Sequence, residues 1–185
     1  MCLGWRKPRY QARHTDGMGD DRIATPVLHG TFSLDFDVAA DPARVFAAYA
    51  DPAVRRLWFR MPAAPGTRHH ELDFRVGGGE VASAAFAPYG DDGPLERIEY
   101  RSRFLDIADG ERIVVGYEFI LDDVRRWVSQ VTIGFAPAPG KNGTRITHTE
   151  QYALLAYTGD GKNDADHLAG GTRLQFNALA VALAR

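Results

Sequence analysis

A long amphipathic stretch ends the sequence, from Asn163 to Arg185, and the remainder of the fold has to supply a surface for its apolar side. Apolar residues recur there at intervals of three and four, the spacing that aligns side chains on one face of an α-helix. Asn163 or Asp164 can cap the start of this helix. The predicted buried face consists of Leu168, Thr172, Phe176, Leu179 and Leu183, widened by Leu174, Ala178 and Val181.

Two adjacent glycines, Gly170 and Gly171, interrupt this predicted helix. Each glycine costs roughly 1 kcal/mol relative to alanine inside a helix. The missing side chains let a ligand or another backbone approach closely. A pair that is merely tolerated in a frayed first turn explains the glycines equally well.

The segments before this helix alternate between apolar and polar residues, which is the pattern of half-buried β-strands. In the segment from Leu28 to Val38, Phe32 and Phe36 share one face, whereas Ser33 and Asp35 share the other. Because short turns join the later segments, these predict an antiparallel meander. The further predicted strands lie at 70–76, 80–87, 95–107, 113–119, 127–135 and 144–152.

Two Asp-Pro pairs lie between the first and second predicted strands. Asp41-Pro42 and Asp51-Pro52 each place a capping side chain before a proline at the first helical position. They predict two short helices, the first ending near Ala50 and the second running through Trp58. One strand, two helices, six strands and a long helix is the order of an α+β domain with its helices on one face of the sheet.

The N-terminal 26 residues are polar and show no consistent hydrophobic period. We therefore predict a flexible extension at residues 1–26, followed by a single domain at 27–185. Met18 lies just ahead of the patterned region, and we hypothesise that natural translation starts there rather than at residue 1.

The charge balance argues against some partners. A formal net charge of −2 gives no electrostatic basis for binding nucleic acid or an anionic membrane. No apolar run approaches the roughly 20 residues that span a bilayer. The single cysteine, Cys2, cannot form an internal disulfide, so we expect a cytoplasmic protein. A homodimer is left open.

Several short strings occur in an order and spacing that a known family shares. They are Asp41-Pro42-Ala43-Arg44-Val45-Phe46, Asp51-Pro52, Leu57-Trp58, Asp73-Phe74-Arg75-Val76-Gly77-Gly78, Glu111-Arg112-Ile113-Val114 and Gly143-Thr144-Arg145-Ile146-Thr147. Over roughly residues 28 to 184, the chain resembles the C-terminal domain of the heat-shock-protein-90 ATPase activator, within the SRPBCC superfamily of START-like proteins. The resemblance implies the helix-grip fold, also called START-like or Bet v 1-like. In that fold a curved antiparallel sheet and a long C-terminal helix enclose a pocket.

The chain departs from this family at four places, one of which has Ala108-Asp109-Gly110 in place of a common Pro-Pro turn. Family members often have an aromatic residue where Gly79-Glu80 stands here, and a tryptophan where Gly171 stands. Losing these bulky groups would enlarge the pocket. The His-Glu pair that often ends the last strand becomes Glu150-Gln151, with His148 two positions earlier.

The resemblance implies an apolar pocket, and we expect it to bind a small hydrophobic or aromatic molecule without catalysis. Aromatic walls with few polar groups are typical of small-molecule sites, although aromatic residues at strand spacing more often form core. His148 and Glu150 share a strand face about 7 Å apart. They would either contact the ligand or serve structure, with Glu150 paired to an arginine. The predicted site comprises Phe74, Tyr100, Phe104, Trp127, His148, Glu150, Leu168, Thr172 and Phe176.

Two other functions are left open. His148 and Glu150 could transfer protons in a cyclase-like or dehydratase-like enzyme, as in some START-like relatives. A co-chaperone-like domain would instead present a partner surface. Arg55, Arg56 and Arg60 could attract an acidic partner, or they could simply face solvent. The sequence has no nucleophile–base string and no phosphate-binding loop, and we predict no catalytic residue and no cofactor.

Four side chains that can bind metals lie close together along the chain: His69, His70, Glu71 and Asp73. Strand alternation puts His70 on the side opposite the other three. We therefore predict a solvated sheet edge here, and no metal site.

Overall fold

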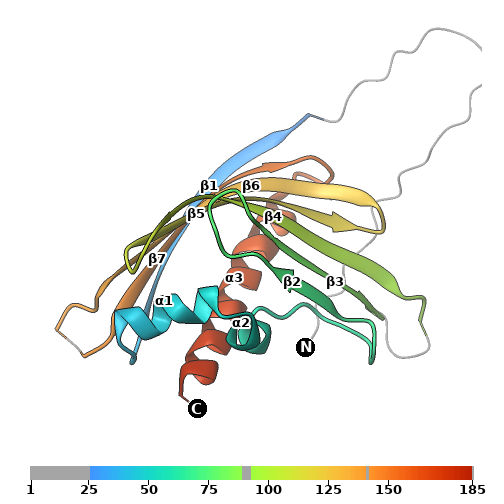
Figure 1. Cartoon of the computed structure of the whole chain (residues 1–185). Helices are drawn as coiled ribbons and strands as arrows, with labels where there is room; N and C mark the ends of the chain where they lie inside the picture. The colour runs from blue at the N-terminus through green and yellow to red at the C-terminus, as the bar shows by residue number, and fades with distance from the viewer. Residues whose placement is uncertain (1–25, 89–92, 141, 185) are drawn as a thin grey trace, which may run out of the picture.

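The computed structural model describes residues 26–88, 93–140 and 142–184. The expected N-terminal extension, apart from Pro26, and the proposed start at Met18 lie outside the described residues. Seven strands and three helices follow one another in the described part (Figure 1). They are β1 (Leu28–Val38), α1 (Pro42–Ala50), α2 (Pro52–Trp58), β2 (His69–Leu72), β3 (Glu80–Phe86), β4 (Glu96–Ala108), β5 (Arg112–Leu121), β6 (Val124–Pro137), β7 (Thr144–Leu154) and α3 (Lys162–Leu183).

The strands form one antiparallel sheet in the order β1-β7-β6-β5-β4-β3-β2. Strands β2 to β7 form the predicted meander, and β1 adds to it beside β7. Figure 1 shows the curved sheet arching over α3, with α1 and α2 on the same concave side. This arrangement confirms the predicted α+β helix-grip fold.

The main apolar core lies on the concave side of the sheet, where all three helices meet the strands. Leu179 of α3, Val45 of α1 and Trp58 of α2 are buried in the same cluster as Ile146 of β7 and Ile113 of β5. Each fully buried aliphatic side chain of this size contributes roughly 1.5–3 kcal/mol. The core therefore holds the helices against the sheet and fixes the geometry of its concave face.

Both Asp-Pro pairs start helices as predicted. The Asp41 carboxylate accepts a hydrogen bond from the amide of Ala43 at 2.9 Å. Asp51 does the same for the amide of Ala53 at 2.7 Å, and the backbone amide of Asp51 also ends α1 by donating to the carbonyl of Ala47 at 2.9 Å. One aspartate therefore closes the first helix and opens the second, which fixes the angle between them.

The start of α3 differs from the prediction. The helix begins at Lys162, after Gly161 in a left-handed conformation with φ of 78°, so neither Asn163 nor Asp164 is the cap. The Asp164 carboxylate is buried instead, where it accepts from Arg126 Nη2 at 2.6 Å and from the amide of Thr158 at 2.9 Å. A buried ion pair thus holds the first turn of α3 to β6.

The apolar face of α3 is also narrower than predicted. Leu174 and Val181 are 70% and 59% exposed, whereas Leu168, Phe176 and Leu179 are buried. The prediction that Leu174 and Val181 widen the buried face was wrong, because the concave sheet is covered by a narrower strip of the helix.

The hairpin between β2 and β3 departs from the predicted strand at 70–76. Strand β2 ends at Leu72, and the amide of Asp73 donates to the carbonyl of Gly79 at 2.8 Å to begin the turn. The hairpin tip then pairs with Phe104 of β4. A Cβ at Gly79 would collide with the carbonyl of Ser102. Gly79 therefore allows two backbones to approach, and it does not enlarge a pocket as we expected.

Candidate functional site

Four side chains from three adjacent strands form a hydrogen-bonded polar centre on the concave face. Trp127 Nε1 of β6 donates to the Tyr117 hydroxyl of β5 at 3.2 Å. That hydroxyl donates to Glu150 Oε1 of β7 at 2.5 Å. Glu150 Oε2 in turn lies 3.1 Å from His148 Nε2. We call Tyr117, Trp127, His148 and Glu150 the polar centre.

Strand periodicity explains why these groups meet. His148 and Glu150 are two residues apart, so both point to the concave side of β7. Tyr117 lies directly opposite Ser129 in the β5–β6 register, and Ser129 lies opposite Tyr152 in the β6–β7 register. Ser129 is buried, and its hydroxyl makes no hydrogen bond of acceptable geometry. This hydroxyl is a buried polar atom beside the polar centre.

Aromatic rings hold the histidine of the polar centre in its orientation. The His148 ring stacks on Phe32 of β1 with centroids 5.9 Å apart. It also meets the edge of Phe176 of α3 at 5.7 Å. His148 therefore points inward beneath the C-terminal helix. The enzymatic alternative requires this orientation and also an opening from His148 into a pocket.

The carboxylate of the polar centre has no exposed surface: Glu150 is 0% exposed. Its hydrogen-bond partners are a phenol and an imidazole, and the arginine partner that we considered is absent from the described contacts. Burial, followed by the charge of Glu150 and the hydrogen bond to it, raises the pKa of Tyr117 well above its usual value. The phenol therefore stays protonated and keeps donating to the carboxylate.

A second buried polar cluster joins α2 to the β2–β3 hairpin. Arg55 binds the Glu80 carboxylate through Nε at 2.8 Å and Nη2 at 2.7 Å. His70 Nε2 lies 2.7 Å from Glu80 Oε1. The guanidinium of Arg55 also lies over the rings of Trp58 and Phe59, at 4.1 and 4.2 Å from their centroids. We call Arg55, Glu80 and His70 the buried triad.

The electrostatics of the triad favour a charged carboxylate. Burial alone would raise the pKa of Glu80, but the charge and hydrogen bonds of Arg55, with help from His70, hold that pKa below its usual range. The prediction of a solvated edge is therefore wrong for His70, and Arg55 is not a surface residue. His69 and Glu71 are exposed on the other side of β2, as alternation predicted. Among the described residues, no three His, Cys, Asp or Glu side chains are grouped to hold a metal ion.

Tyr100 of β4 connects the two clusters. Its ring lies 4.9 Å from Phe59 on one side and 4.9 Å from Tyr117 on the other, measured between centroids. Burial raises the pKa of its phenol, with a further contribution from the charge of Glu80. A band of polar and aromatic groups therefore crosses the concave face from β2 to β7.

Several aromatic side chains on this concave face are only half-buried, although the face is turned towards the helices. They belong to strands β1, β4, β5 and β7. In a fully packed core such rings would have no exposed surface. Part of the concave face is therefore reached by solvent. The rings are Phe32, Tyr100, Tyr117, Phe119 and Tyr152.

Gly170 and Gly171 belong to α3, the helix that covers the concave face of the sheet. A Cβ added at either Gly170 or Gly171 would have no atom within 4 Å outside its own turn. At about 100° per residue, Gly171 lies about 60° around the helix from buried Leu168, whereas Gly170 lies about 160° away. Gly171 thus borders the buried face, while Gly170 points outward.

The structure divides the predicted site residues into two groups. Tyr100, Trp127, His148, Glu150 and Phe176 contact one another directly or through Tyr117. The rest lie around this group. Leu168 packs with Trp127, the Thr172 hydroxyl donates to the carbonyl of Leu168 at 3.3 Å, and Phe74 and Phe104 pack on each other at the α1 end.

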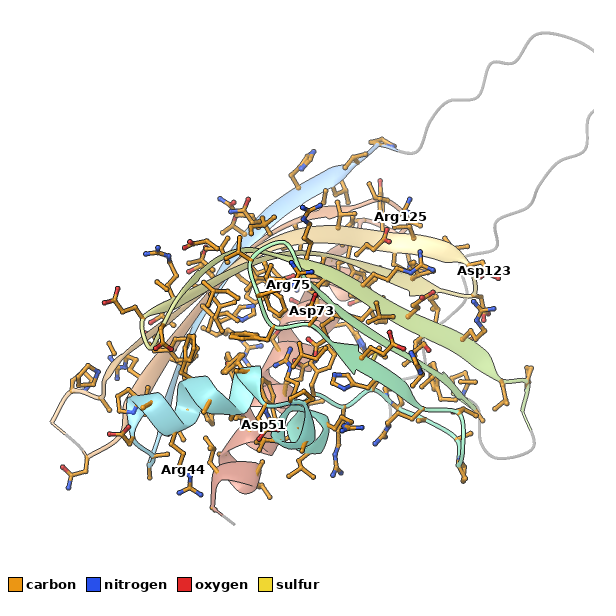
Figure 2. The ribbon with its side chains drawn as sticks, viewed as in Figure 1. Arg44, Asp51, Asp73, Arg75, Asp123 and Arg125 are labelled. Atoms are coloured by element: carbon orange, nitrogen blue, oxygen red, sulfur yellow. The ribbon has the colours of Figure 1, made fainter. Side chains whose placement is uncertain are left out.

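The open hollows on the described surface include two that none of the nine predicted residues lines. One, of about 320 Å³, lies between α2 and α3. The other, of about 230 Å³, lies on the convex side of the sheet among residues that include Arg101 and Arg125. Figure 2 shows Asp123 and Arg125 at the β5–β6 turn, far from α1.

The fold and these contacts define a helix-grip domain with a buried polar centre under its C-terminal helix. The model of one protein family, described as "Activator of Hsp90 ATPase homolog 1-like protein", matches residues 39–184, and the chain belongs to this family. A search of curated proteins gives no match. No helix in the described part of the chain is long and apolar enough to cross a membrane.

Solved structures agree with this family. The Mll3558 protein from Rhizobium loti is 34% identical with a TM-score of 0.69, and the match covers 85% of this chain and 99% of that one. An uncharacterized protein from Rhizobium leguminosarum is 31% identical with a TM-score of 0.71, covering 86% and 97%. DynU16, from the dynemicin biosynthetic locus, shares the fold at 17% identity and a TM-score of 0.57, covering 83% of this chain and 46% of that one.

Proposed function

We propose that this is a cytoplasmic protein that binds a small hydrophobic or aromatic molecule between α3 and the concave face of the sheet. The observation that carries the proposal is the polar centre of Tyr117, Trp127, His148 and Glu150 among half-buried aromatic rings. Few convergent polar groups within apolar walls are the usual composition of a small-molecule site. A single cysteine, Cys2, suits a reducing compartment.

The chemistry of the concave face indicates how such a ligand would be held. Because Glu150 has no exposed surface, its role is to orient Tyr117 and His148, and these two would meet the ligand. The buried Ser129 hydroxyl lies on β6 directly opposite Tyr117. Tyr100 and Phe119 supply flat apolar walls, and the missing side chain at Gly171 leaves room at the edge of the helix.

The test uses N-phenyl-1-naphthylamine, a neutral aromatic dye whose fluorescence rises in apolar sites. We expect Gly171→Leu to weaken dye binding about tenfold, because the new side chain occupies the space beside the concave face. Gly170→Leu is the matched control, with the same substitution one residue away on the outward side of α3. Thermal unfolding of both variants checks that the fold is intact. Equal effects of the two substitutions, or no saturable dye binding, would refute the proposal.

Native mass spectrometry of protein purified from its own host identifies the natural ligand. We expect a co-purifying small molecule that is lost from Gly171→Leu and retained by Gly170→Leu. That molecule can then displace the dye in competition.

A second candidate function is acid–base catalysis on the bound molecule, by a cyclase-like or dehydratase-like reaction. The observation that favours it is the inward-facing His148, 3.1 Å from Glu150. In that case a ligand that co-purifies with His148→Gln would be converted by the wild type, and His148→Gln would bind it without converting it. If the wild type leaves the ligand unchanged after prolonged incubation, catalysis is refuted and binding is the only one of the two functions that remains.

A further inference from the structure

The hollow between α2 and α3 lies outside the concave face and has its own chemistry. It is lined by Leu57, Arg60, Asn177, Ala178, Val181 and Ala182, with a volume of about 320 Å³. We call these residues the helical groove. Leu57 is 38% and Val181 59% exposed, so the groove presents apolar side chains directly to solvent.

The apolar surface continues along α3. Leu174 precedes Val181 by seven residues, so both lie on one stripe of the helix, and Leu174 is 70% exposed. An exposed apolar stripe beside a groove is a feature of surfaces that bind partners. A contiguous exposed apolar patch is also what the partner-binding alternative predicts.

The charge around the groove is one-sided. Arg60 lines it and Arg173 lies one turn before Asn177, and neither makes a hydrogen bond or ion pair within the described part of the chain. Arg56 is exposed, and within the described residues it forms only a hydrogen bond to the carbonyl of Pro52. Figure 2 shows Arg44 on α1 pointing away from the sheet. From Leu168 to its end at Leu183, α3 contains no acidic residue.

The arginines on the opposite side of the molecule, the convex face of the sheet, differ in their pairing. Most exposed arginines on the convex face of the sheet pair with neighbouring carboxylates, as Arg101 does with Glu99 at 2.8 Å and Arg112 with Asp106 at 2.7 Å. The whole chain carries a formal charge of −2. Arg56, Arg60 and Arg173 have no carboxylate partner among the described residues and lie at the helices, next to the exposed apolar stripe, whereas Arg103 is an unpaired arginine on β4.

We infer that the helical groove binds an acidic amphipathic helix of a partner protein. Apolar side chains of that helix would enter between Leu57 and Val181, and its carboxylates would meet Arg60 and Arg173. This is the helix-in-groove mode, in which anchors at i, i+3, i+4 and i+7 fill an apolar groove. The complementary charge sets specificity and the rate of association.

The other occupants fit less well. Residues 1–25 of this chain contain five Lys or Arg against three Asp, so their charge does not complement the groove. A symmetric contact with a second copy would bring Arg60 and Arg173 close to their counterparts. A bilayer is flat on this scale and does not fill a hollow between two helices.

The experiment uses a fluorescein-labelled synthetic peptide of about 18 residues, with leucines at helical spacing and glutamates elsewhere. Its control is the same peptide with lysine in place of glutamate. We expect the glutamate peptide to bind and the lysine peptide not to bind. Raising NaCl from about 0.05 to about 0.5 M should weaken binding severalfold, because salt screens exposed charges.

Matched variants locate the site. Arg60→Glu and Val181→Asp should each weaken binding about tenfold. Arg103→Glu is the control for charge: Arg103 is exposed on β4 outside the groove and forms no ion pair with other described residues. Leu95→Asp is the control for apolarity, at a residue 54% exposed outside the groove. Circular dichroism checks folding, and amide chemical shifts should change around Leu57 and Ala178.

Three results would overturn the inference. One is equal binding of both peptides, or binding that Arg60→Glu and Arg103→Glu weaken alike. Another is that the peptide does not bind, whereas anionic vesicles do bind and Val181→Asp abolishes the vesicle binding. This result would assign the surface to a membrane. The third is self-association that Val181→Asp abolishes, which would assign it to a second copy. Dye binding at the concave face is measured separately, so either proposal can fail alone.

Discussion

The buried triad allows a sharp test of how α2 is held to the sheet. Arg55 and Glu80 are separated by 25 residues in sequence but form two hydrogen bonds. Their side chains are 10% and 1% exposed. Arg55→Met would leave the Glu80 carboxylate buried with His70 alone, and Glu80→Gln would leave the Arg55 charge uncompensated. Breaking a buried pair on one side costs about 3–5 kcal/mol.

The double variant Arg55→Met/Glu80→Gln should be much less destabilised than the sum of the single variants. Removing both charges also removes the cost of their burial, so the pair couples by about 1–3 kcal/mol in a double-mutant cycle. For a domain of this size, each 1 kcal/mol lowers the melting temperature by about 2–4 °C. Each single variant should therefore melt roughly 6–20 °C below the wild type.

The sign of the pH dependence follows from the lowered pKa of Glu80. A carboxyl group whose pKa is lowered on folding stabilises the protein above its unfolded pKa, about 4.3, and loses that contribution as the pH falls through the folded value. The deficit of Arg55→Met should therefore be largest at neutral pH and shrink in acid.

Urea denaturation followed by circular dichroism measures all four proteins. Arg112→Met is the control, because the Arg112–Asp106 pair is about half exposed, with side-chain exposures of 48% and 46%, and should contribute less than about 1 kcal/mol. Additive losses in the double variant, or single losses no larger than that of the control, would show that the triad is not a coupled buried network.

Three further predictions concern single tyrosines and glycines. Tyr117→Phe removes the hydrogen bond to the buried Glu150 carboxylate and should cost roughly 1–3 kcal/mol in urea denaturation; an unchanged midpoint would contradict the network. Gly79→Ala should cost roughly 1–3 kcal/mol because its Cβ would meet the backbone of β4, whereas Gly134→Ala, with no atom within 4 Å of an added Cβ, should stay close to wild type in thermal unfolding. In an alkaline titration followed by ultraviolet absorbance, three phenols should ionise only as the protein unfolds. Their raised pKa values give stability that is lost as the pH rises above about 10. Ionisation of every tyrosine with the fold intact would count against this prediction. The three are Tyr49, Tyr100 and Tyr117.

The order of elements could be predicted because it rests on local patterns. Alternation predicted the strands, and side-chain caps at Asp41 and Asp51 predicted the two short helices. Alternation also placed His148 and Glu150 on one face of β7. Each of these inferences needs only neighbouring residues, and the periods of helices and strands are fixed by backbone geometry.

The partners of the polar groups could not be predicted, because they depend on contacts between distant segments. Arg55 lies beside Arg56 in sequence and looked like part of a surface cluster, yet Glu80 binds it inside the fold. Asp164 looked like a helix cap, but Arg126 approaches it from β6. One signal was present: Glu80 shares strand parity with alanines on the concave face, so a charged residue there required a partner.

The pairing of β1 with β7 has a consequence for synthesis of the chain on the ribosome. Ser33 hydrogen-bonds to Thr149, 116 residues later, and all eleven residues of β1 find their partners between Thr144 and Leu154. The nascent chain therefore carries an unpaired, half-apolar strand until nearly its whole length has emerged. Such distant pairing slows folding and prolongs the exposure of that strand. The aspartates at positions 35 and 37, which alternate with its apolar residues, disfavour premature association of nascent chains through this edge.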